Sequence, residues 1–247
     1  MKGEKGLRGE GEMGEKIDIS FVMPMFNEEE NIGNAISEIE SLAKDIADGY
    51  EIIITDDAST DKSVCVVEEI AKNNDKIKLF CLKENSKFGG AFAKCFEEAT
   101  KEVILYMDSD MPVSTEDIKA SIPLIHNADV VTGYSRIKKG ETTLRKIIST
   151  GYNVLVKLLF GLKIHDINSG YKIVRKKVIE GVKFISRSPF IDVEIFLEAK
   201  KKDCKVKQFP LIFRARSGGR SYIASFPIIL ATFRDMLKVK ISLCKKN

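Results

Sequence analysis

Short apolar runs of strand length alternate with helix-like segments through the first half of this chain of 247 residues. Strands are expected at 17–25, 50–55, 77–82, 103–107 and 128–132, and helices at 28–46, 62–72, 88–100 and 114–126. This repetition predicts an α/β fold with a Rossmann-like, mostly parallel sheet that carries helices on both faces. Such sheets bind their ligands at the carboxyl ends of the strands, where this sequence places several polar clusters.

The second half of the chain breaks this alternation. Helices are expected at 145–163, 191–202 and 226–239, and a strand at 206–214. Residues 1–15 are rich in Gly, Glu and Lys without an apolar segment, so we expect a disordered leader rather than a signal peptide. One domain is expected at 16–223, followed by an amphipathic helix at 224–247, for which binding in the membrane interface and packing on the domain both stay open. Translation from Met1 and from Met13 both stay open.

The amino-acid composition narrows the kinds of ligand that the chain is expected to bind. The first 130 residues carry a net charge of −14 and the remaining residues a net charge of +18. The acidic half can hold an anion through metal ions, whereas the basic half can meet phosphates, nucleic acid or a membrane surface directly. The five cysteines are widely spaced and there are two histidines, which argues against a zinc site or a disulfide framework and fits a reducing cytosol. The chain has no run of 18 apolar residues, so no transmembrane helix is expected.

The apolar run Val103–Met107 ends in Asp108-Ser109-Asp110. If the strand persists, both carboxylates point to the same face. Two like charges at this place are costly unless a cation lies between them, and a Mg²⁺ or Mn²⁺ ion that also binds a diphosphate meets that need. The motif alone is also typical of turns and helix caps.

Two further polar clusters follow expected strands. Asn27-Glu28 comes after the first strand and Asp56-Asp57 after the second. Asp61 is placed to cap the next helix, whereas Asp56 and Asp57 come too early for that role. Their carboxylates can accept hydrogen bonds from a base or a ribose.

Five motifs then occur in a recognisable order. They are Pro24-Met25-Phe26-Asn27-Glu28, Asp56-Asp57-Ala58-Ser59, Asp108-Ser109-Asp110, Gly133-Tyr134-Ser135-Arg136 and Asn168-Ser169-Gly170-Tyr171. Over about residues 17–223 the chain resembles the family 2 glycosyltransferases of GT-A fold. It is most similar to their dolichol-phosphate mannose synthase and dolichyl-phosphate glucosyltransferase branch. Each motif is weak alone, but the ordered set is specific.

The resemblance implies a nucleotide-sugar donor, a divalent metal (Mg²⁺ or Mn²⁺) and a polyprenyl-phosphate acceptor. The positions implied to bind the nucleotide are Pro24, Asn27, Glu28, Asp56, Asp57, Asp108, Arg216 and Ser221. Asp108 and Asp110 are implied to hold the metal and the diphosphate. The positions implied to meet the acceptor phosphate are Arg136, Arg145 and Ser149, which together with Asp110 form the implied catalytic set.

The chain departs from the family pattern in three places. Lys87 replaces the first glycine of the family's Asn-x-Gly-x-Gly-Gly sequence, and Pro112 stands where a polar metal contact often follows the D-x-D pair. Tyr222 stands where the late loop usually has a lysine. These departures leave the donor open between the GDP-mannose and UDP-glucose types, although 168–172 and 191–194 lean toward the glucosyltransferases.

We therefore expect a metal-dependent hexosyltransferase that acts on a polyprenyl or dolichyl phosphate, peripheral on the cytoplasmic face of a membrane and without a nucleic-acid partner. One alternative is a sugar hydroxyl acceptor, for which Asp192 or Glu194 would be the general base. Another is a non-catalytic basic module that binds membranes or nucleic acid, which the D-x-D carboxylates disfavour. The sugar, the anomeric outcome, the oligomeric state and a separate membrane subunit stay open.

Overall fold

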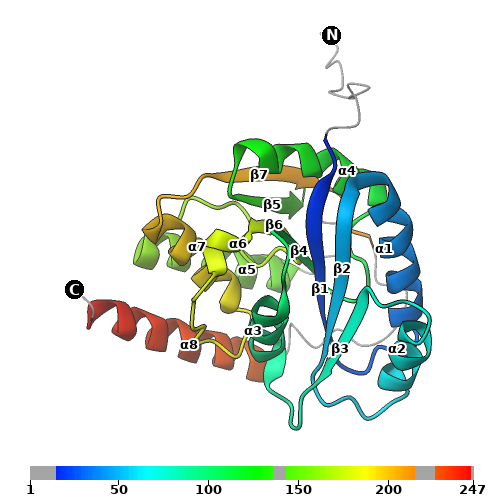
Figure 1. Ribbon diagram of the computed structural model, residues 1–247. Coiled ribbons are helices and arrows are strands. Elements are labelled where there is room, and N and C mark those ends of the chain that lie inside the picture. The colour runs from blue at the N-terminus through cyan, green and yellow to red at the C-terminus, as the bar shows by residue number, and fades with distance from the viewer. Residues whose placement is uncertain (1–14, 136–142, 215–225, 246–247) are drawn as a thin grey trace.

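The computed structural model describes residues 15–135, 143–214 and 226–245, without the side chains of 143–147. These residues form a seven-stranded sheet of order β3-β2-β1-β4-β6-β5-β7 (Figure 1). The strands are β1 (Ile17–Met25), β2 (Ala47–Asp56), β3 (Ile77–Cys81), β4 (Val103–Met107), β5 (Val130–Ser135), β6 (Tyr171–Arg175) and β7 (Val206–Leu211). β6 runs antiparallel to its neighbours β4 and β5, and the other neighbouring strands are parallel. The predicted mostly parallel sheet is confirmed.

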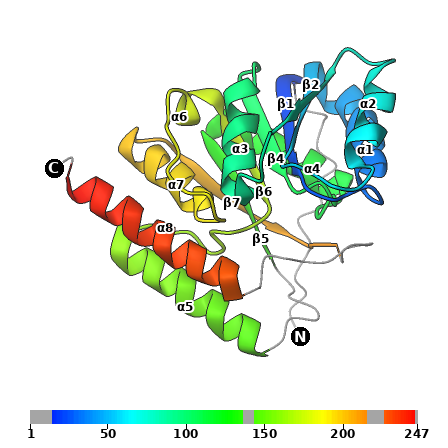
Figure 2. The same ribbon diagram turned by 90° about the horizontal axis from the view of Figure 1, so that it is seen from below.

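Helices cover both faces of the sheet (Figures 1 and 2). One face carries α1 (Ile32–Ile46), α2 (Ser63–Ala71), α4 (Thr115–Ser121) and the 3₁₀ helix η1 (Ile122–Asn127). The other face carries α3 (Lys87–Glu98), α5 (Thr143–Phe160), α6 (Lys176–Ile179), α7 (Ile191–Lys201) and α8 (Phe226–Cys244). Each layer encloses a hydrophobic core of its own.

The alternation of side chains along the strands builds both cores at once. In β2, Ile52 and Ile54 enter the core under α1, whereas Ile53 enters the core under α3. All three side chains are fully buried, because both faces of the strand are covered. This double burial is why the central strands are continuous apolar runs in the sequence.

Several elements differ from their predicted bounds. The first helix begins at Ile32 instead of residue 28, because Glu28 O accepts hydrogen bonds from Asn31 N and Ile32 N in a preceding turn. The helix expected at 114–126 changes from α to 3₁₀ at Ile122, next to Pro123, which has no N–H for an α-helical bond. β6 was not anticipated. Conversely, α8 extends to Cys244, beyond the expected residue 239.

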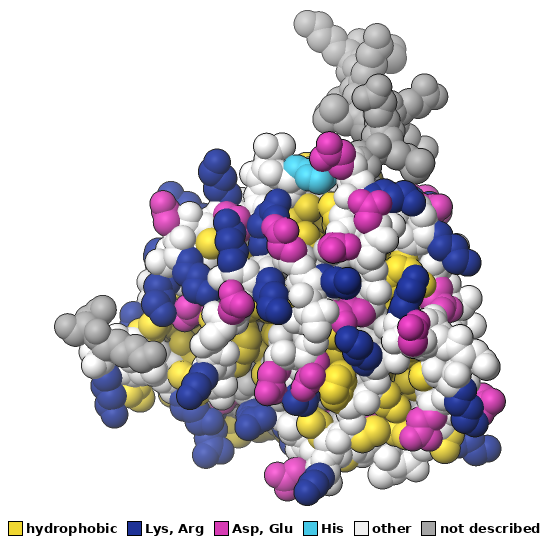
Figure 3. Space-filling view, viewed as in Figure 1, with side chains coloured by type: hydrophobic (Ala, Val, Ile, Leu, Met, Phe, Trp, Pro, Cys, Tyr) yellow, Lys and Arg dark blue, Asp and Glu magenta, His cyan; other side chains and the backbone are white. Residues whose placement is uncertain are grey.

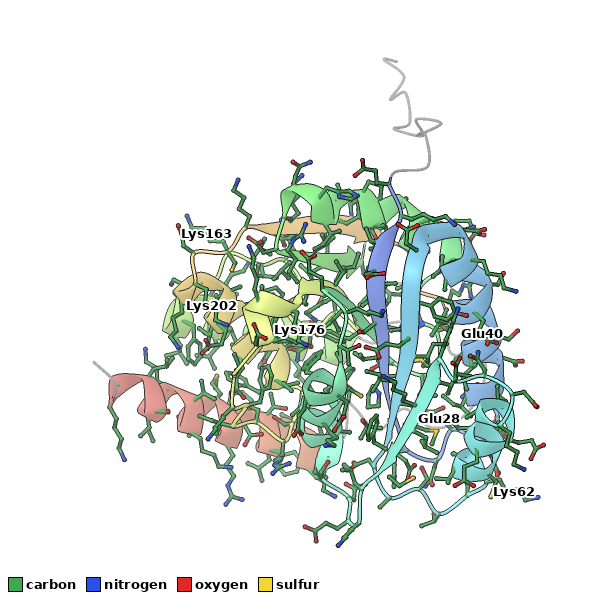
Figure 4. The ribbon with its side chains drawn as sticks, in the orientation of Figure 1. Glu28, Glu40, Lys62, Lys163, Lys176 and Lys202 are labelled. Carbon is green, nitrogen blue, oxygen red and sulfur yellow. The ribbon has the colours of Figure 1, made fainter. Side chains whose placement is uncertain are left out.

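Lys and Arg side chains gather on the side of the molecule formed by α6 and α7 (Figure 3). The labelled Lys163, Lys176 and Lys202 lie on this side (Figure 4). One of these lysines stabilises the end of a helix, because Lys202 Nζ donates to the carbonyls of Lys177 (2.7 Å) and Val178 (3.0 Å) at the end of α6.

Most of the predicted leader lies outside the described residues. Within the described ranges, no helix combines the length and the hydrophobicity needed to cross a bilayer.

Candidate active site

The loops that follow β1, β2, β3 and β4 share an unusual backbone feature. In three of these loops, and at the helical residue that ends the β3 loop, one non-glycine residue lies in the left-handed region: Asn27 (φ 55°), Ala58 (63°), Met111 (49°) and Lys87 (67°), the first residue of α3. Among the described residues, the one other case is Asp203 (52°). Non-glycine residues adopt this conformation at an energetic cost, and such strain clusters at functional sites. The carboxyl edge of the sheet, at the bottom of Figure 1, is therefore the candidate site.

Hydrogen bonds lock the β1 and β2 loops together. Asn27 N donates to Ser59 Oγ (2.9 Å), and Asn27 Oδ1 accepts from Thr60 N (2.8 Å). The buried Asp56 carboxylate accepts from Ser59 N (3.1 Å). The predicted nucleotide residues Asn27 and Asp56 therefore also shape the wall that they form.

Glu28 continues the same wall. Its backbone N donates to Ser63 Oγ (2.8 Å), and its carboxylate accepts from Asn31 Nδ2 (2.7 Å). It lies on the α1–α2 side of the molecule, as does Lys62 (Figure 4). Pro24 lies one residue before the end of β1, beside Thr55 of β2. Ser59, which the sequence analysis quoted only as the last residue of a motif, and Ser63, which it did not name, connect these residues.

Asp57 points toward α3 instead. Its Oδ1 accepts from Ser86 N (2.6 Å) and Ser86 Oγ (2.8 Å), so it ties the β2 loop to the start of α3. Burial raises the pKa of the Asp57 carboxyl, against the hydrogen bonds from Ser86, which lower it. The neighbouring Asp56 and Asp57 thus hydrogen-bond to two different segments, Asp56 to the β2 loop and Asp57 to the residue before α3.

Asp108 and Asp110 follow β4, as the strand expected at 103–107 implied, but the strand does not persist through them, so the condition for both carboxylates to point to the same face is not met. β4 ends at Met107, and Met111 N donates to Asp108 O (3.2 Å). Both carboxylates are half-buried. A Cβ on Gly170 would lie 2.9 Å from Asp108 Oδ2, so the Asn168–Tyr171 motif packs directly against Asp108.

The carboxylate oxygens of this site suit a metal ion that binds together with a substrate phosphate. In the described part of the chain, no three His, Cys, Asp or Glu side chains are grouped as metal ligands. Asp108 and Asp110 offer hard oxygen donors, and Mg²⁺ in proteins is commonly held by one or two carboxylates plus waters and substrate phosphates. The pair fits Mg²⁺ or Mn²⁺ in that role and does not fit a permanent cage made by the protein alone.

A buried polar network, unexpected from the sequence, lies behind this turn. Lys172 of β6 has its Nζ 3.1 Å from Asp192 Oδ1 of α7, and Tyr106 of β4 donates its hydroxyl to the same oxygen. Burial raises the pKa of Asp192 and lowers that of Lys172, while each partner's charge acts in the opposite direction. Glu194 is buried as well, and it accepts from Ile185 N (2.9 Å) and Ser186 N (2.7 Å). The two candidate general bases are therefore both engaged in structural contacts.

The model of glycosyl transferase family 2 matches residues 20–182. The chain belongs to this family. It is 30% identical over 213 residues to dolichol-phosphate mannosyltransferase from Pyrococcus furiosus, with 83% of this chain and 59% of that protein covered. It is 26% identical over 182 residues to dodecaprenyl-phosphate galacturonate synthase from Rhizobium johnstonii, with 72% and 54% covered. The chain thus spans between half and two thirds of the length of either family member.

Solved structures bear out the GT-A fold. Glucosyl-3-phosphoglycerate synthase from Mycobacterium tuberculosis, in complex with Mn²⁺, uridine diphosphate and glucosyl-3-phosphoglycerate, matches with a TM-score of 0.72 and 16% identity. The match covers 95% of this chain and 86% of that one. At this identity the likeness concerns the fold alone.

Most of the residues expected at the acceptor phosphate, together with Arg216 and Ser221 expected at the donor phosphates, have side chains outside the described part of the structure. Arg136, Arg216 and Ser221 lie outside the described residues. Arg145 lies near the start of α5, and its side chain is likewise outside them. Ser149 is half-buried on α5, where its carbonyl accepts from Asn153 Nδ2 (3.0 Å). The family roles of these residues stay predictions.

Helices α5 and α8 lie side by side at the same end of the molecule (Figure 2). Lys240 Nζ of α8 donates to Leu159 O of α5 (2.9 Å). Asp235 fastens α8 to the domain by accepting from Arg187 N and Ser188 N (3.0 Å each), and Met236 enters the core. Apolar side chains of the two helices are nevertheless exposed: Ile148, Val154, Leu158, Phe226, Leu230, Phe233, Leu237 and Ile241.

Proposed function

We propose that this chain transfers a hexose from a nucleoside-diphosphate sugar to a polyprenyl or dolichyl phosphate. The observation that carries the proposal is the Asp108–Asp110 turn at the carboxyl edge of a family 2 glycosyltransferase sheet. The names of the two curated relatives described above contain dolichol phosphate and dodecaprenyl phosphate, which supports a lipid phosphate of this class as the acceptor here.

The wall built by the β1 and β2 loops is the proposed nucleotide site. Pro24, Asn27 and Glu28 would line the nucleotide, and Asp56 and Asp57 would meet the base and ribose. Arg216 and Ser221 of the late loop are proposed to close over the donor phosphates. The donor's base and sugar, of the GDP-mannose or UDP-glucose type, are left to the experiment below.

Asp108 and Asp110 would hold Mg²⁺ or Mn²⁺ against the diphosphate. When bound, the metal neutralises the negative charge that develops on the leaving nucleoside diphosphate. The protein's own part is to place two carboxylates on a turn that Gly170 supports from behind. Position and charge together are what this transfer requires of the site.

The acceptor phosphate is already an anionic nucleophile, so the reaction needs no strong general base. This agrees with the burial and hydrogen bonding of Asp192 and Glu194, which disfavour a neutral hydroxyl acceptor. Arg136, Arg145 and Ser149 are proposed to hold the acceptor phosphate, because an Arg guanidinium binds phosphate oxygens in bidentate fashion.

A lipid acceptor requires access to a bilayer. The exposed apolar side chains of α5 and α8 lie next to basic residues such as Arg234, Lys238 and Lys245. Apolar area and nearby Lys or Arg together favour an anionic membrane surface, at about 1 kcal/mol for each basic residue. We therefore place the chain peripherally on the cytoplasmic face of a membrane.

Nucleotide binding tests the donor half of the proposal. Thermal unfolding is measured with GDP and with UDP, each with and without Mn²⁺, for the full chain and for Asp110→Asn. A ligand at 100 times its Kd stabilises the native state by about 2.7 kcal/mol, which corresponds to roughly 5–10 °C for a chain of this size. We expect one nucleotide to produce such a shift with Mn²⁺ in the wild type and a much smaller shift in Asp110→Asn. If no nucleotide gives a metal-dependent shift, or if Asp110→Asn responds like the wild type, the donor assignment is wrong.

A further inference from the structure

Lys172 is the one lysine among the largest fully buried side chains of the described residues, with 0% of its surface exposed. It lies in the middle of the sheet, directly opposite Tyr106 in the β4–β6 register. Lysine is almost never fully buried without a partner, and a buried ion pair is often no more stable than well-packed apolar side chains. Stability alone is therefore a weak reason for its presence.

The contacts of Lys172 lead toward the metal turn. Its Nζ lies 3.1 Å from Asp192 Oδ1 and donates a second hydrogen bond of 2.6 Å to Ser169 O. The next residue is Gly170, whose missing side chain leaves the space that Asp108 Oδ2 occupies. One lysine thus fixes the carbonyl immediately before the backbone position on which the Asp108 carboxylate rests.

We propose that Lys172 is a positioning residue for the metal site, and that it acts by holding the Ser169–Gly170 backbone against Asp108. Asp192 supplies the counter-charge that allows the ammonium group to be buried, and the Tyr106 hydroxyl donates to Asp192 from β4, which ends at Met107 directly before Asp108. The Ser169–Gly170 backbone then keeps the Asp108 carboxylate oriented toward the metal and the diphosphate. Partners that orient a metal ligand typically change metal affinity by about 10–100-fold when removed. The inference rests on the proposed function.

Two variants separate positioning from stability. Lys172→Met and Asp192→Asn both break the ion pair, but Lys172→Met alone removes the donor to Ser169 O, since the Asp192→Asn variant keeps the lysine amine in place. The double variant Lys172→Met/Asp192→Leu removes both charges, and such replacements are often neutral or stabilising. Lys78→Met is the matched control, because Lys78 pairs with the buried Glu51 (2.8 Å) within β2 and β3, among residues assigned no part in the metal site.

The measurement is isothermal titration of the full-length variants with GDP and with UDP, each with and without Mn²⁺. The readout is the ratio of nucleotide affinity with Mn²⁺ to that without it. We expect this ratio to fall at least about tenfold in Lys172→Met and in the double variant. It should stay within about twofold of the wild type in Asp192→Asn and Lys78→Met, where the bond to Ser169 O is kept.

The outcomes are distinguishable. If the wild type shows no gain from Mn²⁺, the proposed function fails. If the wild type gains but the folded double variant gains equally, or if Asp192→Asn loses as much as Lys172→Met, the positioning role is wrong. Gly170→Ala keeps the test open should the Lys172 variants unfold, because its Cβ would lie 2.9 Å from Asp108 Oδ2 and should lower the same ratio. An unchanged ratio in Gly170→Ala also overturns the inference.

Discussion

Replacing Lys87 by glycine should stabilise the protein. Lys87 begins α3 with φ 67°, and its side chain is exposed. The left-handed conformation costs a non-glycine residue about 1–2 kcal/mol. Glycine avoids this cost but loses about 0.5–1 kcal/mol through the greater freedom of the unfolded chain. The difference is about 0–1.5 kcal/mol, and its centre predicts that Lys87→Gly raises the free energy of unfolding by about 0.75 kcal/mol and the Tm by about 1.5–3 °C.

Two controls isolate the backbone effect in urea and thermal unfolding. Asn27→Gly relaxes a similar angle, φ 55°, but also removes the oxygen that accepts from Thr60 N, a loss of about 1 kcal/mol, so its stability should fall. Lys83→Gly changes an exposed lysine outside the left-handed region and should cost about 0.5–1 kcal/mol. A Lys87→Gly protein that is no more stable than the wild type would refute the reasoning.

Four further variants should change stability or membrane binding in a definite direction. Gly89→Ala places a Cβ 2.6 Å from Ser186 O, so urea unfolding should show a loss of about 1–3 kcal/mol, whereas a Cβ on Gly151 meets no atom within 4 Å and Gly151→Ala should stabilise α5. Burial opposes ionisation of Glu51, but hydrogen bonds from Lys78, Ser20 and Thr100 lower its pKa to about 2. The ionised Glu51 carboxylate therefore stabilises the fold fully above about pH 4.3, the pKa of a glutamate in the unfolded chain, and this stabilisation is lost as the pH falls toward 2. The difference in free energy of unfolding between the wild type and Glu51→Gln should therefore shrink between neutral pH and about pH 3. Leu230→Ser/Leu237→Ser should weaken salt-sensitive co-sedimentation with anionic liposomes while the Tm holds, because both side chains are exposed; equal binding by this variant and the wild type would exclude α8 as the membrane contact.

The central βαβ pattern was predictable because its strands are buried on both faces. Ile52, Ile53 and Ile54 are apolar without interruption, and the polar clusters after β1, β2 and β4 follow directly from strand ends. β6 escaped prediction because it is short and has a lysine at its second position, which normally signals exposure. Its antiparallel insertion between β4 and β5 depends on contacts far apart in the sequence.

The site was predictable as a set of residues but not as a geometry. Asp108 and Asp110 were expected directly after the 103–107 strand, but the turn closed by Met111 N that carries them depends on backbone hydrogen bonding that the motif does not specify. The serines that connect the loops, Ser59 and Ser86, have side chains too common in loops to be singled out by sequence. Lys172 and Asp192 meet through tertiary packing of β6 on α7, for which no local pattern exists.

Because α8 has a buried side as well as an exposed one, membrane binding is better tested by point substitutions than by removing the helix. Met236 and Val239 are buried in the core that α8 shares with α3, α5 and α7, so truncation before α8 would open that core as well as remove the apolar surface. Point substitutions on the exposed face avoid this confusion.

The most direct measurement is transfer of a labelled hexose by the full chain, from GDP-mannose and from UDP-glucose, to polyprenyl phosphate with Mn²⁺. The matched acceptor is the same polyprenol without its phosphate, and the matched conditions are a metal chelator and the Asp110→Asn variant. The account predicts labelled lipid with one of the two donors when phosphate, metal and Asp110 are all present, and little or none when any is missing. Equal transfer to the unphosphorylated polyprenol, or transfer that persists in Asp110→Asn, would contradict it.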